Sequence, residues 1–343
     1  MLKKILIALA VVILIGLGVG YYFYQQIFGP NLSPIKTPYT LLIPRGASFD
    51  TVYHRLTRDS VLRNNKSFRL LAKWMHYDRP SVPSGRYVLQ GSLSNYALIS
   101  KLRIANQDPV RLTFSSARTY RELCGKLASP LSLDSLTLLV AMDSVIHDST
   151  NQINRYNILC HFIPNTYLIY WDITPKKLLS RLFKERDKYW RSSQNKRALE
   201  RLHMGPDEVC TLASIVEKES NLKEERPIIA GVYLNRLHRD IKLQADPTVV
   251  FATGNFGLRR ILNKHLKIES PYNTYLHTGL PPGPICLPSR NAIESVLKAP
   301  EHDYIFFCAK PGYTGAHNFA KDLRGHAHNA RIYRKWLNKE HIN

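Results

Sequence analysis

The chain has 343 residues, enough for about two domains and a buried core. With 44% hydrophobic, 10% aromatic and 22% charged residues, its composition is that of an ordinary globular protein, which excludes a disordered, collagen-like or disulfide-scaffold protein. Lys and Arg number 48 against 26 Asp and Glu, so the net charge is +22 at pH 7. A surface this basic favours a polyanionic partner: nucleic acid, anionic lipid or an acidic polymer.

The N-terminus carries a long apolar run. Residues 5–24 hold no charge and, as a helix, would span about 30 Å of hydrocarbon. Lys3 and Lys4 precede the run, which predicts residues 1–4 in the cytoplasm and the remaining chain outside. A cleaved signal peptide is the alternative. The apolar core of a signal peptide has about 7–15 residues and is followed by an Ala-x-Ala-like site, whereas the run at 5–24 is longer and no such site follows it. We therefore predict a retained, single-pass helix in the cell (inner) membrane and a periplasmic or extracytoplasmic domain.

Export narrows the choice of partner. Nucleic acid is not expected outside the cytoplasm, which leaves anionic headgroups and the acidic peptides and lactyl groups of the cell wall. The five cysteines are widely spaced and form no CxxC pair, so they indicate small buried residues rather than a zinc or redox motif.

The segments after the apolar run predict an α+β protein. A short breaker-rich tether at 25–36 leads to a compact module at 37–114. Within this module the sequence predicts strands at 39–44 and 85–89 and helices at 49–57, 65–75 and 94–105. Residues 115–204 read as a mainly helical connecting region, in which the charged stretch 184–201 is a solvated helix face. From residue 205 onward, dense polar and Gly-Pro segments are typical of loops shaped around a ligand.

One glutamate stands out on geometric grounds. A helix opening at Pro206 carries apolar residues at core spacing; at 100° per residue, Glu219 lies about 50° from this apolar face and Glu217 about 110°. A carboxyl at the rim of an apolar face loses solvation, so its pKa rises toward the range of a general acid. Glu217 fits a surface charge or an ion-pair partner. The competing interpretation of Glu219 is an ordinary helix-end surface charge.

Several polar residues downstream have two interpretations. Asp246 begins an Asp-Pro-Thr sequence, so it could cap a turn or helix as readily as catalyse. Amide and tyrosine side chains at Asn235, Gln244, Asn273 and Tyr275 suit a sugar site, although buried Asn and Gln often satisfy loop backbone instead. Tyrosines at 233, 272 and 275 could stack on sugar rings. His317 and His326 have no third ligand in view, so hydrogen bonding is favoured over a metal site.

Five ordered motifs carry a resemblance to a known family. They are 213–220 (ASIVEKES), 231–237 (GVYLNRL), 243–249 (LQADPTV), 272–275 (YNTY) and 279–285 (GLPPGPI). Together they resemble the endolytic murein transglycosylase, or YceG-like, family. The match is strong from 205 to about 333, and the region 37–114 resembles the LysM-like subdomain of that family in layout more than in residues.

The resemblance implies a fold, a site and a reaction. The fold would be a transmembrane helix, a LysM-like α+β module and a mixed α/β catalytic domain at 205–343. The second Glu of the Glu-Lys-Glu sequence, Glu219, would be catalytic. The predicted substrate-binding residues are Ser220, Asn235, Gln244, Asp246, Thr248, Tyr272, Asn273, Tyr275 and His317.

The implied reaction is non-hydrolytic cleavage of the MurNAc–GlcNAc β-1,4 bond, which leaves 1,6-anhydroMurNAc ends and trims or terminates nascent glycan strands. It needs no metal or cofactor; the expected partners are peptidoglycan strands, the membrane and, as candidates, peptidoglycan synthases. Two alternatives remain. A hydrolytic muramidase would use Glu219 as acid and Asp246 as base or nucleophile, and a wall-binding scaffold would need no catalytic residue.

Overall fold

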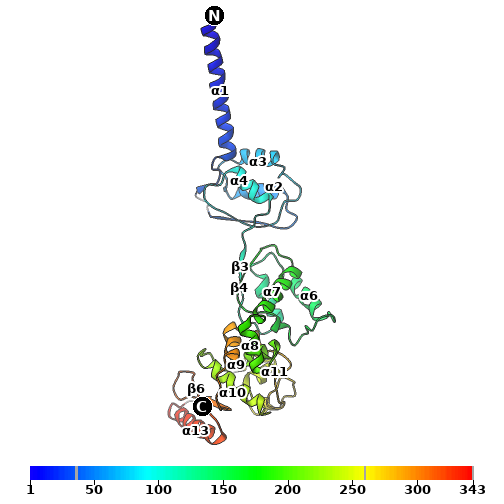
Figure 1. Ribbon diagram of the computed structural model, residues 1–343, viewed down its shortest axis with the longest axis vertical. Helices are drawn as coiled ribbons and strands as arrows, with labels where there is room; N and C mark the ends of the chain where they lie inside the picture. Colours follow the sequence, from blue (N-terminus) through cyan, green and yellow to red (C-terminus); the bar gives the residue numbers. More distant parts are fainter. Residues whose placement is uncertain (35–37, 259, 342–343) are drawn as a thin grey trace. The chain divides into compact units, whose positions relative to one another are not determined.

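A computed structural model describes residues 1–34, 38–258 and 260–341 and divides the chain into two compact units (Figure 1). The first unit is Met1–Leu112, Pro130–Leu133 and Tyr167–Thr174; the second is Thr113–Ser129, Asp134–Thr166 and Pro175–Asn343. The predicted boundary between residues 204 and 205 lies inside the second unit. The predicted tether residues 35–36, residue 37 of the predicted module and residues 259 and 342–343 of the predicted catalytic domain lie outside the described residues.

The predicted α+β class is confirmed. The first unit contains α1 (Leu2–Phe28), β1 (Tyr39–Ile43), α2 (Phe49–Arg58), α3 (Asn65–Trp74), β2 (Gly85–Leu89) and α4 (Asn95–Arg103). Strands β3 (Val110–Thr113) and β4 (Thr166–Ile169) form a two-stranded sheet.

The small module that follows α1 forms around an antiparallel β1–β2 pair. Leu41 lies opposite Tyr87, and both are fully buried, because alternate residues of each strand face the helices. The three helices begin at Ser48, Asn64 and Ser94, whose side chains accept a backbone N–H of the first turn. Period-two apolar residues and polar caps explain why the sequence predicts these elements closely.

The predicted tether is not a free linker. Helix α1 continues to Phe28, and the following residues pack on the module: Asn31 N–H donates to Leu93 O at 3.0 Å, and Ser33 N–H donates to Val61 O at 2.8 Å. The Asn31 side chain is buried and bonded to Asn95 at 2.6 Å. The glycine and prolines of this segment change the direction of the chain, while its backbone stays hydrogen-bonded to the module.

Helix α1 is an apolar helix of 27 residues that is long and apolar enough to cross a membrane. None of its residues is buried in the protein.

The second unit is mostly helical. Its helices are α5 (Tyr120–Ala128), α6 (Ser135–Ile146), α7 (Pro175–Trp190), α8 (Ser193–Leu202), α9 (Pro206–Glu219), α10 (Arg226–His238), α11 (Asp246–Thr253), α12 (Arg290–Leu297) and α13 (Leu323–Lys339), with short 3₁₀ helices η2 (Ile158–His161) and η3 (His265–Lys267). Strands β5 (Phe306–Ala309) and β6 (His317–Ala320) pair antiparallel. Each sheet described here has two strands, so helices rather than a central sheet carry the predicted catalytic domain.

Helix α9 is the centre of this unit. It packs against α10, α11 and α12, and an unbroken run from Val209 to Val216 is buried, including the polar Thr211 and Ser214. A helix that is buried all round is close-packed against its neighbours, so moving it would open cavities that cost free energy. It therefore gives a rigid support to the residue at its C-terminal end, which is Glu219.

Candidate active site

Glu219 is the last residue of α9, and its side chain is partly buried. Helix α10 lies beside it and brings Tyr233 to the carboxyl group: the Tyr233 hydroxyl donates a hydrogen bond of 2.5 Å to Glu219 Oε1. Tyr233 is itself 1% exposed and packs edge-on to Phe307, so its hydroxyl is fixed. The carboxyl therefore has one defined orientation.

A cavity of about 380 Å³ opens in front of Glu219. Its wall is formed by Arg118, Lys218, Glu219, Asp246, Pro247, Val250, Phe251, Phe256, Leu258, Ile261 and Ile285. Two carboxylates, two cations and several apolar and aromatic side chains thus share one space. A mostly apolar wall with a few charged groups is the usual composition of a binding or active site.

The environment of Glu219 changes its acidity. Burial raises its pKa from 4.5 to about 7; the nearby charge of Asp246 also raises it, while the Tyr233 hydrogen bond and Arg236 oppose the rise. Loss of solvation dominates because it penalises the charged carboxylate. At neutral pH a large share of Glu219 is therefore protonated and able to donate a proton.

Arg236 organises the loops on the same side of α10. Its guanidinium is buried and donates to Ile305 O at 2.6 Å, to Leu243 O at 2.9 Å and to Lys242 O at 3.1 Å. The group also lies 5.2 Å from the ring centre of Phe306. Arg236 thereby holds β5 and the segment that leads into α11 against the helix that carries Tyr233.

Asp246 is the first residue of α11 and lines the cavity with Glu219. Its Oδ1 accepts a hydrogen bond of 2.6 Å from the Tyr275 hydroxyl. Burial, followed by the hydrogen bond to Asp246, raises the pKa of Tyr275, so this phenol remains neutral. The two predicted residues Asp246 and Tyr275 are thus brought together at the edge of the site.

The side chains of three predicted binding residues make hydrogen bonds to other groups of the protein. Asn235 Nδ2 donates to His302 O at 2.6 Å and to Tyr304 O at 2.9 Å. Thr248 is fully buried and bonds to Thr274 at 2.8 Å. Asn273 is also fully buried, and its amide donates to the carbonyls of Leu266 and Ile268. These contacts join Asn235 of α10 and Thr248 of α11 to neighbouring segments, and Asn273 to loop carbonyls; binding of substrate by these residues stays a prediction.

Ser220, Gln244 and His317 also contact the protein. Ser220 is the C-cap that follows α9, and its hydroxyl accepts the N–H of Leu222 at 3.0 Å. Gln244 Oε1 accepts a 3.3 Å hydrogen bond from Arg236. His317 Nδ1 lies 2.8 Å from Glu225 Oε2, and its backbone N–H donates to the same carboxylate at 2.9 Å. The Glu225 contact ties β6 to the N-terminal cap of α10.

Tyr272 packs behind the wall of the cavity rather than in it. Its ring lies 4.5 Å from that of Phe251, which lines the cavity, and burial raises the pKa of Tyr272 to about 12. Phe251 and Phe256 also lie together, with Arg118 4.5 Å above the Phe256 ring. Aromatic faces backed by a cation are suited to stacking against a sugar ring.

The interpretation of Glu217 as a surface charge or ion-pair partner is wrong. Its carboxylate accepts the backbone N–H of Ser289, the residue that caps α12. This contact joins α9 to α12. It gives Glu217 a structural role, which differs from the role of Glu219 as the candidate acid. The partner is 72 residues away in sequence, so helix geometry alone did not reveal it.

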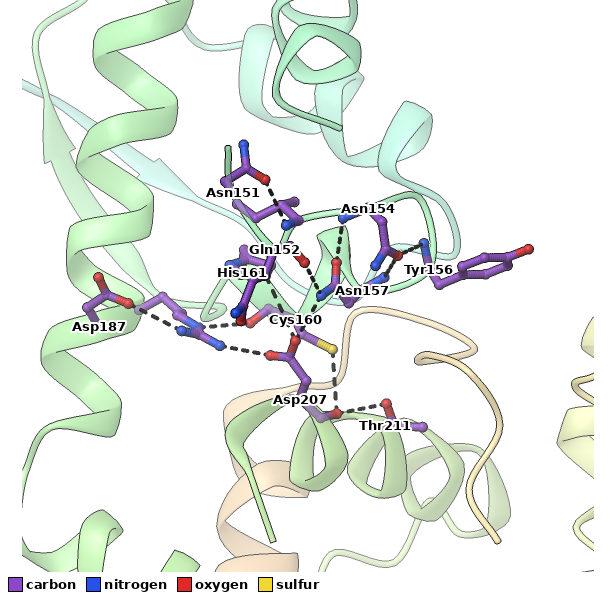
Figure 2. Close-up of polar contacts among 12 residues, drawn as sticks. Asn151, Gln152, Asn154, Tyr156, Asn157, Cys160, His161, Asp187, Asp207 and Thr211 are labelled. Carbon is purple, nitrogen blue, oxygen red and sulfur yellow. Dashed lines mark hydrogen bonds and ion pairs between the residues drawn. The ribbon is translucent and has the colours of Figure 1, made fainter. Parts of the chain in front are cut away.

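The start of α9 is fixed by an Asn-rich segment, 151–157, shown in Figure 2. Asp207 accepts hydrogen bonds from Asn157 at 3.0 Å and from Arg186 at 2.8 Å. Asn154 Oδ1 accepts the N–H of Tyr156 at 2.8 Å, and the Tyr156 backbone lies against Gly283 of the motif 279–285. A Cβ at Gly283 would approach the Tyr156 carbonyl oxygen to 2.0 Å, so this close contact requires glycine.

Sequence reasoning missed part of the site. Arg118, Lys218, Phe251 and Phe256 line the cavity but were not predicted, because they come from separate segments without a shared pattern. The sequence suggests Tyr233 as a stacking residue, whereas in the structure its hydroxyl contacts Glu219. Its spacing of three residues from Arg236 places both on one face of α10, and that was the available signal.

Among the described residues, no group of three His, Cys, Asp or Glu side chains is arranged to hold a metal.

Comparison with known sequences defines the class. The sequence profile of the YceG-like family matches residues 41–332, and this chain belongs to that family. A relative from Streptococcus pneumoniae (strain D39), named endolytic murein transglycosylase, is 28% identical over 328 residues that cover 84% of this chain. This chain spans 58% of the length of that relative.

Two further proteins are similar over most of their length. An endolytic murein transglycosylase of Bacillus subtilis (strain 168) is 27% identical, with 90% of this chain and 89% of the relative aligned. The 2.6 Å crystal structure of a YceG-like protein from Listeria monocytogenes superimposes with a TM-score of 0.53 at 26% identity, covering 84% of this chain and 97% of that one. The fold of this chain is therefore the YceG-like fold.

Proposed function

We propose that this chain is a membrane-anchored endolytic lytic transglycosylase that cleaves peptidoglycan glycan strands. One observation carries the proposal: a rigidly held glutamate with a pKa raised to about 7 faces a cavity of about 380 Å³ lined by cations and aromatic rings. The relatives named endolytic murein transglycosylase support peptidoglycan as the substrate. The protein would trim or terminate nascent strands, with peptidoglycan synthases as expected partners.

In the proposed reaction Glu219 acts twice. Protonated Glu219 donates its proton to the glycosidic oxygen as the bond from C1 of MurNAc to O4 of GlcNAc breaks. The substrate N-acetyl group stabilises the positive charge at C1. The C6 hydroxyl of MurNAc then attacks C1 and returns its proton to Glu219, which closes the 1,6-anhydro ring without consuming water.

The role of Asp246 separates this reaction from hydrolysis. A muramidase would need a second carboxylate to activate water or to attack C1. Asp246 lines the same cavity, but its Oδ1 is already bonded to Tyr275. We therefore assign to Asp246 and Tyr275 the binding of sugar hydroxyls, together with the aromatic wall of Phe251, Phe256 and Tyr272.

Mass spectrometry of glycan digested by the wild-type protein tests the proposal directly. We expect fragments that end in 1,6-anhydroMurNAc, because no water enters the reaction. Fragments with free reducing ends would indicate the muramidase, and undigested but bound glycan would indicate a wall-binding scaffold.

The Tyr233→Phe variant should move the pH profile of the reaction. The Tyr233 hydrogen bond lowers the Glu219 pKa, so its removal raises that pKa by about one to two units, given that a hydrogen bond to a charged group is worth about 1.5–3 kcal/mol. Because the acid form is the active one, the alkaline limb of kcat/KM should shift from about pH 7 to about pH 8–9. An unchanged limb would contradict the role given to Tyr233.

Tyr304→Phe is the matched control for this measurement. Tyr304 contacts the rings of His302 and Phe319 in the same unit. Its alkaline limb should coincide with that of the wild type.

The proposed placement follows from α1. We propose that residues 5–24 remain as a single-pass anchor in the inner membrane, that residues 1–4 are cytoplasmic, and that the LysM-like module and the catalytic region are extracytoplasmic. Protease added to intact spheroplasts should then remove the extracytoplasmic part of the chain, residues 37–343. Protection of this part, or a mature N-terminus beyond residue 24, would contradict this placement.

A further inference from the structure

The first unit has an apolar cavity of its own, far along the sequence from Glu219. It has a volume of about 610 Å³ and lies where α1 meets α3. Its wall includes Tyr22, Phe23 and Ile27 of α1 and Lys66, Leu70 and Trp74 of α3. Nothing in the proposed reaction uses this cavity.

The junction that forms the cavity is built from specific contacts. Asn64 Nδ2 donates to Gln26 Oε1 at 2.9 Å, and Asn95 Nδ2 donates to the Gln26 carbonyl at 2.9 Å. The ring of Phe28 lies 5.4 Å from that of Tyr96. These bonds hold the end of α1 on the module, so α3 has a fixed height along the α1 axis.

That height coincides with a membrane boundary if α1 is the anchor. Twenty helical residues span about 30 Å, so the apolar run that begins at Ile5 reaches the far edge of the hydrocarbon at Tyr24. Tyr22 and Phe23 lie within one turn of this edge and share the cavity wall with Leu70 and Trp74. The cavity therefore sits at the hydrocarbon–headgroup boundary.

The outer face of α3 has the chemistry of such a boundary. Leu70 is 66% exposed and Trp74 is 75% exposed, which is costly in water for two large apolar side chains on one helix face. Lys66 and Lys73 are exposed on the same helix, while its opposite face is buried in the module. Trp and Lys beside each other are typical of helices that lie at a membrane surface, where Lys meets anionic headgroups.

We propose that α3 is an interfacial helix of the membrane in which α1 is anchored. Leu70 and Trp74 insert between lipid acyl chains beside Tyr22 and Phe23, and a lipid acyl chain occupies the 610 Å³ cavity. Lys66 and Lys73 contact lipid phosphates. The module is thereby held against the bilayer surface at two places, α1 and α3. This inference rests on the proposed anchoring by α1 and not on the proposed reaction.

Quenching of tryptophan by brominated lipid tests the proposal on the full chain. The protein is reconstituted into vesicles of phosphatidylcholine and phosphatidylglycerol whose acyl chains are either unlabelled or brominated near the glycerol end. Of the four tryptophans, we expect only Trp74 to be within reach of bromine, so brominated vesicles should quench part of the emission. Trp74→Phe should abolish this quenching, whereas the matched variant Trp336→Phe should lower the total emission and leave the quenching in place.

The controls separate the possible failures. Flotation of the protein with the vesicles, without any quenching, would overturn the interfacial role of α3 while leaving the anchor intact, and would assign this surface to water or a protein partner. Quenching that persists in Trp74→Phe would also overturn the interfacial role of α3. A protein that does not float would refute the anchor and with it this inference. Fluorescence does not depend on turnover, so failure of the proposed reaction would leave all these results unaffected.

Discussion

Replacing Glu219 by Gln should lower the rate of anhydro-product formation by about 10²–10⁴-fold, the usual worth of general acid–base assistance. Glutamine keeps the shape of the side chain and can still accept the 2.5 Å hydrogen bond from Tyr233. It can neither donate a proton to the glycosidic oxygen nor take one from the C6 hydroxyl. Initial rates from chromatography of digested glycan measure the change, and glycan binding should survive.

Two matched variants show whether the effect is specific. Glu217→Gln, two residues earlier on α9, keeps an oxygen that can accept the Ser289 N–H, so its rate should stay close to that of the wild type. Asp246→Asn should weaken activity without producing reducing ends. Undiminished anhydro products from a folded Glu219→Gln protein would falsify the assignment of this residue.

The stability of Glu219→Gln should confirm that its loss of activity is not unfolding. The folded-state pKa of Glu219, about 7, lies above its ordinary value of 4.5, so the folded protein retains a proton that the unfolded chain releases. Wild-type stability therefore falls as pH rises from about 4.5 through 7, by on the order of 3 kcal/mol. Gln cannot ionise, so the stability of the variant relative to wild type should increase across this window in urea titrations. A relative stability that does not change with pH would contradict the raised pKa.

Replacing Arg236 by Gln should destabilise the second unit by about 3 kcal/mol, because removing a buried cation leaves several acceptors without a donor. Arg236 is 8% exposed and donates to three backbone carbonyls, those of Lys242, Leu243 and Ile305. Glutamine is too short to reach all three. Urea unfolding followed by circular dichroism measures the loss.

Arg239→Gln is the control for this change. Arg239 is exposed just after α10, so its replacement should change the free energy of unfolding by no more than about 0.5 kcal/mol. Equal stabilities for the Arg236 and Arg239 variants would show that the Arg236 hydrogen bonds do not hold the loops.

The sequence by itself determined the secondary structure of the first module. Apolar alternation fixed β1 and β2, and polar residues such as Ser48 and Ser94 fixed where helices begin, because these signals act over a few neighbouring residues. It also singled out Glu219, since helix periodicity alone places this residue at the rim of an apolar face. The family was equally accessible, because its five motifs are short and ordered along the chain.

Only the tertiary structure decided the environment of Glu219. Its acidity depends on burial and on Tyr233, Arg236 and Asp246, which belong to other helices. The predicted binding residues Thr248 and Asn273 have the polar side chains of a sugar site, yet folding buries Thr248 within α11 and Asn273 in the loop that follows η3. Likewise Glu217 binds a backbone N–H 72 residues away. Solvation and hydrogen bonding arise between segments that are distant in sequence, so no local pattern records them.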